Sequence, residues 1–455
     1  MNTTDKNATI AVIGAGSIGI AVAYYLVTQH QATNVVLIDP RDPMSLTSAQ
    51  SGENYRNWWP HPVMTAFTDH SIDLMEAIDR ESDGMLNMTR GGYALVTRRE
   101  RPQDLIDDLY RGYGADSTQI RIRESAAPDY QPPLRAPWQS APAGVDVLLD
   151  RDLIRSTFPS FAPDVGAVIH VRRAGSISAQ QLGQYMLTRI RAKGARLMRA
   201  EVKAITGSSP FTLELATTEG IAHLQADVVV NAAGPYLQDI GAMLGQDIPV
   251  KHIYQQKISF EDRERAIDRK MPFTIDLDEQ RLAWSAEDAA LLASDPQTRR
   301  LVGPMQGSIH CRPDGPVDGN WIKLGWAYNK DASDPHGDDP LDPHFPDTVL
   351  RGASNLHPKL AAYIGRLPRG ARHYGGYYTM TDENWPLIGK MKTPGAFIAG
   401  ALSGYGSMAA CSTGALCAAW VFGQEVPQYA MQLTMDRYQD DVLKAELAKL
   451  GGGCL

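Results

Sequence analysis

The sequence predicts a two-domain α/β protein, and three observations lead to this fold class. The chain has 455 residues, more than the roughly 250–300 at which one hydrophobic core usually stops growing. Its first forty residues read as strand, glycine-rich turn, helix and strand. Residues 393–424 repeat the strand, glycine turn and helix. No other internal repeat is present, and the two units indicate helices packed on a sheet.

The composition is that of a soluble globular protein, with 43% hydrophobic and 21% charged residues. The formal net charge is -8 and no lysine/arginine block is present, which argues against nucleic acid as a partner. The cysteines show no metal-ligand spacing, so we expect reduced thiols and no metal. They are Cys311, Cys411, Cys417 and Cys454.

Two uncharged stretches, residues 9–38 and 393–424, have the length of membrane spans. Both are rich in Gly, Ala and Ser, and so are much less apolar than a leucine-rich span. The N-terminus "MNTTDKN" also lacks the basic region of a signal peptide. We therefore expect buried helices, no membrane span and a cytoplasmic protein.

The N-terminal unit contains a dinucleotide-binding motif. In "ATIAVIGAGSIGIAVAYYLVTQHQATNVVLIDP" a short apolar strand precedes Gly14, Gly16 and Gly19. The first glycine permits the tight turn, the second lets the backbone approach a pyrophosphate, and the third allows close packing of the helix. Asp39 ends the second strand, where its carboxylate can accept the ribose hydroxyls. The pattern predicts a Rossmann-like domain that binds FAD or NAD rather than NADP.

Five further segments, taken with this motif, resemble the D-amino-acid-oxidase/sarcosine-oxidase superfamily of flavoproteins over nearly the whole chain. They are "RAGSISAQQLGQYMLTRIRAKGARL" (173–197), "ADVVVNAAGPYLQDIG" (226–241), "WIKLGWA" (321–327), "GGYYTMTDENWPLIG" (375–389) and "FIAGALSGYGSMAA" (397–410). The resemblance selects FAD as the cofactor. It implies a discontinuous FAD-binding domain (1–88, 150–250, 371–455) and an antiparallel-sheet substrate domain (89–149, 251–370).

The resemblance also implies which residues contact FAD. The expected set is Gly14, Gly16, Ser17, Ile18, Gly19, Asp39, Pro40, Arg41, Ser48, Ser51, Gly52, Val202, Ala233, Gly234, Gly404, Tyr405, Gly406, Ser407 and Met408. The last five begin the second glycine-turn helix. The N–H groups and partial positive charge at such a helix start would stabilise the N1–C2=O edge of a reduced flavin.

The stretch "SGENYRNWWP" (51–60) follows the second strand, where family members carry the chain over the flavin ring. Arg56 would place a fixed cation beside the isoalloxazine or a substrate carboxylate, and Trp58 or Trp59 could form a wall of the pocket. The alternatives are a surface salt bridge between Arg56 and Glu53, and tryptophans that belong to the core.

Lys323 stands in the alternating strand "NWIKLGWAY", with Trp321 and Gly325 on its face. It matches the lysine that sarcosine-oxidase-like enzymes place over the flavin, where its charge assists the reaction with oxygen. The alternative is a solvated lysine that extends to water. Tyr378 matches a family tyrosine that faces the substrate.

Family members often carry a basic residue where this chain has Glu53, and three further positions depart from the family pattern. Gly376 stands where covalently flavinylated relatives carry cysteine, so we expect non-covalent FAD. Met408 and Ala327 replace a substrate-binding lysine and histidine of sarcosine oxidases. A substrate carboxylate would then need another cation, such as Arg56, Arg281 or Arg312. Otherwise the substrate is an amine without a carboxylate there.

These observations predict a flavoprotein that oxidises a C–N bond of an amine or (N-alkyl) amino acid. Hydride passes to flavin N5, the imine is hydrolysed, and O2 reoxidises the flavin to give H2O2. One alternative is a dehydrogenase that passes electrons to a quinone or protein acceptor. Another is a flavin-binding assembly protein without turnover.

Overall fold

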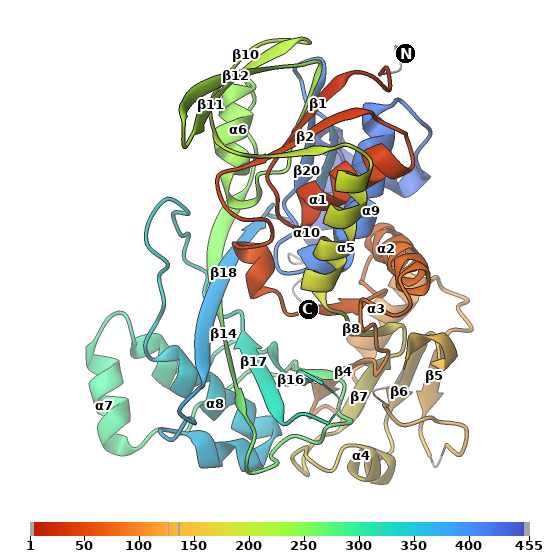
Figure 1. The fold of residues 1–455 in the computed structure, drawn as a ribbon. Coiled ribbons are helices and arrows are strands. Elements are labelled where there is room, and N and C mark those ends of the chain that lie inside the picture. The colour runs from red at the N-terminus through yellow and green to blue at the C-terminus, as the bar shows by residue number, and fades with distance from the viewer. Residues whose placement is uncertain (1–3, 126, 135–136, 317, 450–455) are drawn as a thin grey trace.

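The computed structural model describes residues 4–125, 127–134, 137–316 and 318–449. The mixed α/β fold class is confirmed. A mainly parallel sheet with its helices occupies the upper half of the view in Figure 1, and a larger sheet occupies the lower half. The long strands β14 (Lys251–Glu261) and β18 (Arg372–Met380) extend from one half to the other.

The first sheet has six strands in the order β19-β20-β13-β1-β2-β9, and all neighbours are parallel except β19 and β20. Its strands are β1 (Thr9–Ile13), β2 (Asn34–Asp39), β9 (Arg196–Arg199), β13 (Val228–Asn231), β19 (Leu387–Lys390) and β20 (Ala396–Gly400). The chain segments that meet here lie almost 400 residues apart, since β1 and β20 both pair with β13.

Alternation along β1 divides the core into two layers. Ile10 and Val12 face one side, where they pack with helices α1 (Ser17–Thr28), α2 (Pro62–Glu81), α5 (Ala179–Ala192) and α9 (Gly406–Val421). Ala11 and Ile13 face the other side, because successive strand side chains point to opposite faces. That side is covered by α6 (Leu237–Met243) and the three-stranded sheet β10 (Glu201–Gly207), β11 (Phe211–Thr217) and β12 (Gly220–Ala226).

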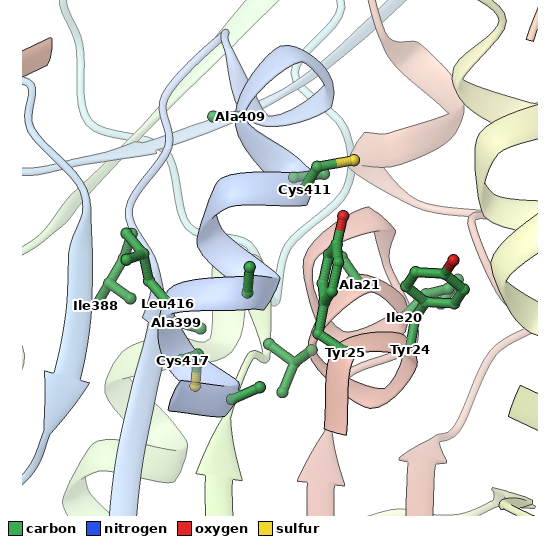
Figure 2. Close-up of a cluster of buried hydrophobic side chains, with 14 of the residues drawn as sticks. Ile20, Ala21, Tyr24, Tyr25, Ile388, Ala399, Ala409, Cys411, Leu416 and Cys417 are labelled. Carbon is green, nitrogen blue, oxygen red and sulfur yellow. The ribbon is translucent and has the colours of Figure 1, made fainter. Parts of the chain in front are cut away.

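Helices α1 and α9 belong to the two uncharged stretches, and they pack against each other inside the protein (Figure 2). A Cβ on Gly414 would lie 2.5 Å from the carbonyl carbon of Ala21, so only glycine permits this approach. Figure 2 shows Tyr25 of α1 pointing toward Cys411 of α9. The small residues therefore serve close helix packing. Among the described residues, no helix is long and apolar enough to cross a membrane.

The second sheet has nine strands in the order β18-β14-β17-β16-β15-β4-β7-β6-β5. Its other strands are β4 (Tyr93–Thr97), β5 (Ile120–Arg123), β6 (Val145–Leu148), β7 (Ala167–Val171), β15 (Phe273–Asp276), β16 (Ile309–Asp314) and β17 (Trp321–Trp326). Most neighbours are antiparallel, but β4–β15 and β5–β6 are parallel. Helices α3 (Gln103–Tyr113), α4 (Arg151–Thr157), α7 (Ala286–Ser294) and α8 (Phe345–Leu356) belong to this half.

The remaining strands form a two-stranded ribbon of β3 (Asn54–Arg56) and β8 (Ala174–Ser176), and the remaining α-helix is α10 (Asp441–Lys449). The strand arrangement changes the expected domain boundaries. The family resemblance places the ranges 150–250 and 371–455 in the FAD-binding domain, yet β7 and β18 within them belong to the nine-stranded sheet. Buried strands of both sheets carry similar apolar residues, so sequence alone does not assign a strand to one sheet.

Candidate active site

A cavity of about 900 Å³ opens at the carboxyl ends of the parallel strands. It is lined by the turn between β1 and α1, the end of β2, the turn after β13 and the turn between β20 and α9. In open α/β sheets this edge is where ligands bind. Both predicted glycine turns therefore line one cavity.

The first glycine turn has no room for side chains. Gly14 has φ +108°, and a Cβ there would lie 2.3 Å from the carbonyl oxygen of Ala232. A Cβ on Gly19 would lie 1.8 Å from the carbonyl oxygen of Gly14. The turn thus brings its backbone close to the cavity at the N-terminus of α1, as pyrophosphate binding requires.

The carboxylate of Asp39 accepts backbone hydrogen bonds at this turn. Its Oδ2 accepts a hydrogen bond from the Ala15 amide at 2.7 Å, and its Oδ1 accepts one from the Arg41 amide at 2.8 Å. A carboxylate oxygen can accept further bonds, so ribose hydroxyls can share these acceptors. Ser48 Oγ accepts from the Ser17 amide at 3.0 Å. These groups fit the adenosine diphosphate part of FAD.

Twelve of the predicted cofactor residues line this cavity: Gly14, Gly16, Ser17, Ile18, Asp39, Pro40, Arg41, Ser48, Val202, Ala233, Gly234 and Gly406. Gly19 packs behind them against Gly14. Ser51, Gly52, Gly404, Tyr405, Ser407 and Met408 are not among its lining residues. Two of these connect the separate segments, since the hydroxyls of Ser51 and Ser407 lie 2.7 Å apart.

One face of the nine-stranded sheet is polar although it is largely buried. Cross-strand pairing places Tyr374, Lys257, Gly325 and His310 in one row across β18, β14, β17 and β16. The next row contains Arg372, Ser259, Lys323 and Arg312. The opposite face is apolar and packs against α8 through Ile258, Phe260, Ile322, Leu324 and Trp326. The predicted alternation along 321–326 is therefore confirmed, with Lys323 on the polar face.

Lys323 belongs to a cluster of two cations and two carboxylates. Its Nζ lies 3.6 Å from Asp314 Oδ1 and 4.0 Å from Glu53 Oε2. Burial, and then the charge of Arg312, lowers the pKa of Lys323 to about 8, although Asp314 and Glu53 act in the opposite direction. Lys323 is 8% exposed. The solvated-strand alternative is therefore wrong.

Glu53 connects this cluster to the loop that precedes β3. Its backbone has φ +56°, a left-handed conformation that is unfavourable for a residue with a side chain. Its Oε1 accepts a hydrogen bond from the Ala179 amide at 3.1 Å, while Oε2 faces Lys323. Two nitrogens of Arg312 donate to the Gly52 carbonyl. The loop 51–53 is thus held directly over the polar face of the sheet.

Arg56 is only 1% exposed, so the surface salt bridge considered above is wrong. Its guanidinium lies 4.6 Å from the ring centre of Trp59 and 5.8 Å from that of Tyr93. Burial lowers the pKa of Arg56 to about 10, and Tyr93 and Tyr113 oppose this shift. Trp58 and Trp59 are themselves buried in two different hydrophobic clusters. Arg56 therefore remains a cation beside aromatic rings.

Tyr378 links the sheet to the second glycine turn. A Cβ on Gly404 would come within 2.5 Å of the Tyr378 ring, so glycine is required where the ring lies against this turn. On the sheet side, the ammonium of Lys257 lies 5.5 Å from the ring centre of Tyr378. The tyrosine thus lies between a buried lysine and the expected flavin-binding turn.

Lys257 and His310 are two residues of this face that no sequence pattern indicates. A Cβ on Gly325, which separates them, would lie 2.3 Å from His310 Nε2 and 3.1 Å from Lys257 Cγ. Burial, and then the charge of Lys257, lowers the pKa of His310 to about 3, so its imidazole is neutral. A lysine and a histidine within apolar strands are the only sequence feature that marks them. This feature becomes informative once the pairing of the strands is known.

Arg281 and Arg312, the other candidates for binding a substrate carboxylate, lie in different environments. The side chain of Arg281 is 75% exposed and pairs with Glu279 at 3.4 Å, so it does not lie in a desolvated pocket. Arg312 donates to the carbonyls of Gly52 and Pro313 and pairs with Asp314 at 2.9 Å. Met408 is buried in the helix core.

Gly376 lies beside the loop that leads to Ser51. A Cβ there would lie 3.2 Å from Gln50 Cβ. Within the described part of the chain, no group of three or more His, Cys, Asp or Glu side chains could hold a metal ion. Cys311, Cys411 and Cys417 are buried free thiols, and Cys454 lies outside the described residues.

A dinucleotide cavity between two glycine turns, beside a sheet with buried cations, is the arrangement of a flavoprotein oxidoreductase. The family model described as FAD dependent oxidoreductase (DAO) matches residues 9–420. The chain belongs to this family, so it is an FAD-dependent oxidoreductase.

The similarity to known proteins covers almost all of the chain. The mitochondrial dimethylglycine dehydrogenase of Homo sapiens is 22% identical over 445 residues, which cover 95% of this chain but 44% of that protein. The L-proline dehydrogenase from P. horikoshii has a similar fold (TM-score 0.70, 16% identity, 96% and 99% of the two chains). Glycine oxidase from Geobacillus kaustophilus is also similar (TM-score 0.68, 17% identity, 95% and 99% of the two chains).

Proposed function

We propose that this protein oxidises the C–N bond of an amine or (N-alkyl) amino acid and passes the electrons to O2, which yields H2O2. The observation that carries the proposal is the buried polar face of the nine-stranded sheet. It presents Lys323, Lys257 and Tyr378 beside the loop 51–53 and the turn at Gly404. The relatives reported above support it, because their names refer to dimethylglycine, proline and glycine.

FAD, bound without a covalent link, would supply the hydride acceptor. Its adenosine end would be held by Asp39, Ser48 and the turn at Gly14. The substrate, as a neutral amine, loses a hydride from carbon and a proton from nitrogen, and the resulting imine is hydrolysed in water to a carbonyl compound and an amine. Protein groups position the substrate and exclude water.

Each of the site residues would have a different task. Tyr378 would bound the substrate space next to Gly404. Arg56 would supply a fixed positive charge from its place beside Trp59 and Tyr93. Lys323 would stabilise the negative charge that develops on oxygen during reoxidation. Its carboxylate partners Asp314 and Glu53 keep it oriented.

A panel of amines and amino acids tests the proposed function. Each compound is added anaerobically to purified protein, and bleaching of the flavin absorbance identifies substrates. Air is then admitted in a stopped-flow instrument. Fast reoxidation with H2O2 release is the expected result. Slow reoxidation that a quinone or carrier protein accelerates would identify a dehydrogenase, and a panel without any bleaching would favour an assembly protein.

A further inference from the structure

Lys257 occupies a central position on the polar face of the sheet. It lies in β14 between β18 and β17, opposite Tyr374 and Gly325. Because Gly325 has no side chain, the stem of Lys257 extends across this position, with Cγ 3.1 Å from where a Cβ would stand. The lysine is therefore placed by the register of three strands rather than by a loop.

The ammonium of Lys257 is buried within the sheet. The residue is 5% exposed, and burial alone lowers its pKa to about 8. Among the described residues, no carboxylate oxygen lies within the 4.0 Å of an ion pair from its Nζ. Lys323 and Arg312, on the same face, both pair with Asp314. A buried charge is costly unless it is paired. An anion bound beside Lys257 would therefore stabilise the charged form of this lysine.

The ammonium of Lys257 lies on the side of the sheet that carries Tyr378 and faces the second glycine turn. It lies 5.5 Å from the ring centre of Tyr378, and that ring lies against Gly404 at the second glycine turn. His310, the other neighbour across Gly325, is neutral and can donate or accept a hydrogen bond. An anion placed near Lys257 would therefore meet its ammonium, a neutral imidazole and an aromatic ring.

We propose that Lys257 binds the carboxylate of the substrate, and that the natural substrate is therefore an amine that carries an acidic group. This inference rests on the proposed function for the identity of the reacting group. Lys257 suits this role better than Arg312, which is already paired, and Arg281, which is exposed. Ion pairing with the ligand would offset the desolvation of the lysine, which makes the position selective for anions.

Ligands that cannot be oxidised test the proposal without turnover. Acetate and benzoate are compared with acetamide and benzamide, which have similar shapes but no charge. Dissociation constants are measured from the change in the visible spectrum of the bound flavin. Wild-type protein should prefer each carboxylate to its amide. Lys257→Met should weaken carboxylate binding by about 30-fold or more and leave amide binding within a few-fold.

Two further variants control for indirect effects. Lys257→Arg keeps a cation and should retain the preference for carboxylates. Lys251→Met removes an exposed lysine from the start of the same strand, where it pairs with Asp382 at 2.9 Å, and should bind carboxylates like the wild type. Flavin content and melting temperature are measured for every variant.

Several outcomes would overturn the role of Lys257. Equal binding of carboxylates and amides by the wild-type protein would overturn the proposal. This test does not depend on whether Lys257→Met folds. A Lys257→Met protein that keeps the preference would assign the carboxylate to another cation, such as Arg56. Slower reoxidation in Lys257→Met with unchanged carboxylate binding would show that the lysine assists the reaction of the reduced flavin with oxygen instead. Failure of the amine panel would refute the proposed function alone, because ligand binding is measured without oxidation.

Discussion

The ammonium of Lys323 and the carboxylate of Asp314 face each other at 3.6 Å across two neighbouring strands of the nine-stranded sheet. Glu53 approaches the same ammonium from the loop before β3, at 4.0 Å. The pair of carboxylates keeps this buried lysine protonated at neutral pH, because its pKa of about 8 remains above 7. Lys323 therefore has a fixed positive charge at the point where the loop 51–53 meets the sheet.

Lys323→Met should slow reoxidation of the flavin by oxygen about a hundred- to a thousandfold. One placed charge is typically worth about 3–4 kcal/mol when charge develops in the transition state. Anaerobic reduction by substrate should change much less, because no negative charge forms on oxygen in that half-reaction. Stopped-flow measurement of the two half-reactions checks this. Equal effects on both would make Lys323 a substrate-positioning residue, and no effect would make its role structural.

The pH dependence of reoxidation should follow the same lysine. Because its folded pKa is lowered to about 8, Lys323 is charged below that pH and loses its proton as the pH rises through it. The reoxidation rate should therefore fall above about pH 8. The charged groups around it are Asp314 and Arg312 of β16, Glu53 and Lys257. Lys323→Met should remove this step, and a step that persists in that variant would exclude Lys323 as its origin.

Asp39→Ala should weaken FAD binding by about 1.5–3 kcal/mol, the expected cost of losing hydrogen bonds between a carboxylate and the ribose. Asp39 also accepts the amides of Ala15 and Arg41, so Asp39→Asn serves as a control that keeps one acceptor. The dissociation constant is measured by fluorescence titration of apoprotein with FAD. The same constant in wild type and in Asp39→Ala would remove Asp39 from the site.

Arg56→Met should slow anaerobic reduction of the flavin or raise the apparent substrate dissociation constant, by about tenfold or more, which corresponds to about 1.4 kcal/mol or more. The reason is that a fixed cation beside Trp59 and Tyr93 is lost while most of the buried volume is kept. FAD content should stay near that of the wild type. Wild-type reduction kinetics in the variant would show that Arg56 acts only in packing.

Acid denaturation should release all of the flavin into solution. Position 376 is glycine, which offers no side chain for the covalent link that the family resemblance would place at this position. The precipitated polypeptide is washed and its absorbance in the flavin region is measured. A yellow precipitate would contradict non-covalent binding.

The sequence predicted the parts of the site that depend on short-range geometry. The turn from Gly14 to Gly19 and the carboxylate at Asp39 lie within one strand–turn–helix–strand unit, so their spacing alone places them together. Alternation also predicted the two faces of β17, with Lys323 opposite to Ile322 and Leu324. Both results follow from periodicities of the local backbone.

Only the tertiary structure distinguished residues that look alike in the sequence. Arg281 and Arg312 were equivalent candidates, yet the side chain of one is 75% exposed and that of the other 7%. The segment "KHIYQQKISFE" does not mark Lys257 as a site residue, because nothing local shows that this strand is buried. Its neighbours Gly325 and Tyr374 are far away in the chain. Local sequence fixes the direction of a side chain relative to its own strand, whereas the pairing of strands decides what that side chain meets.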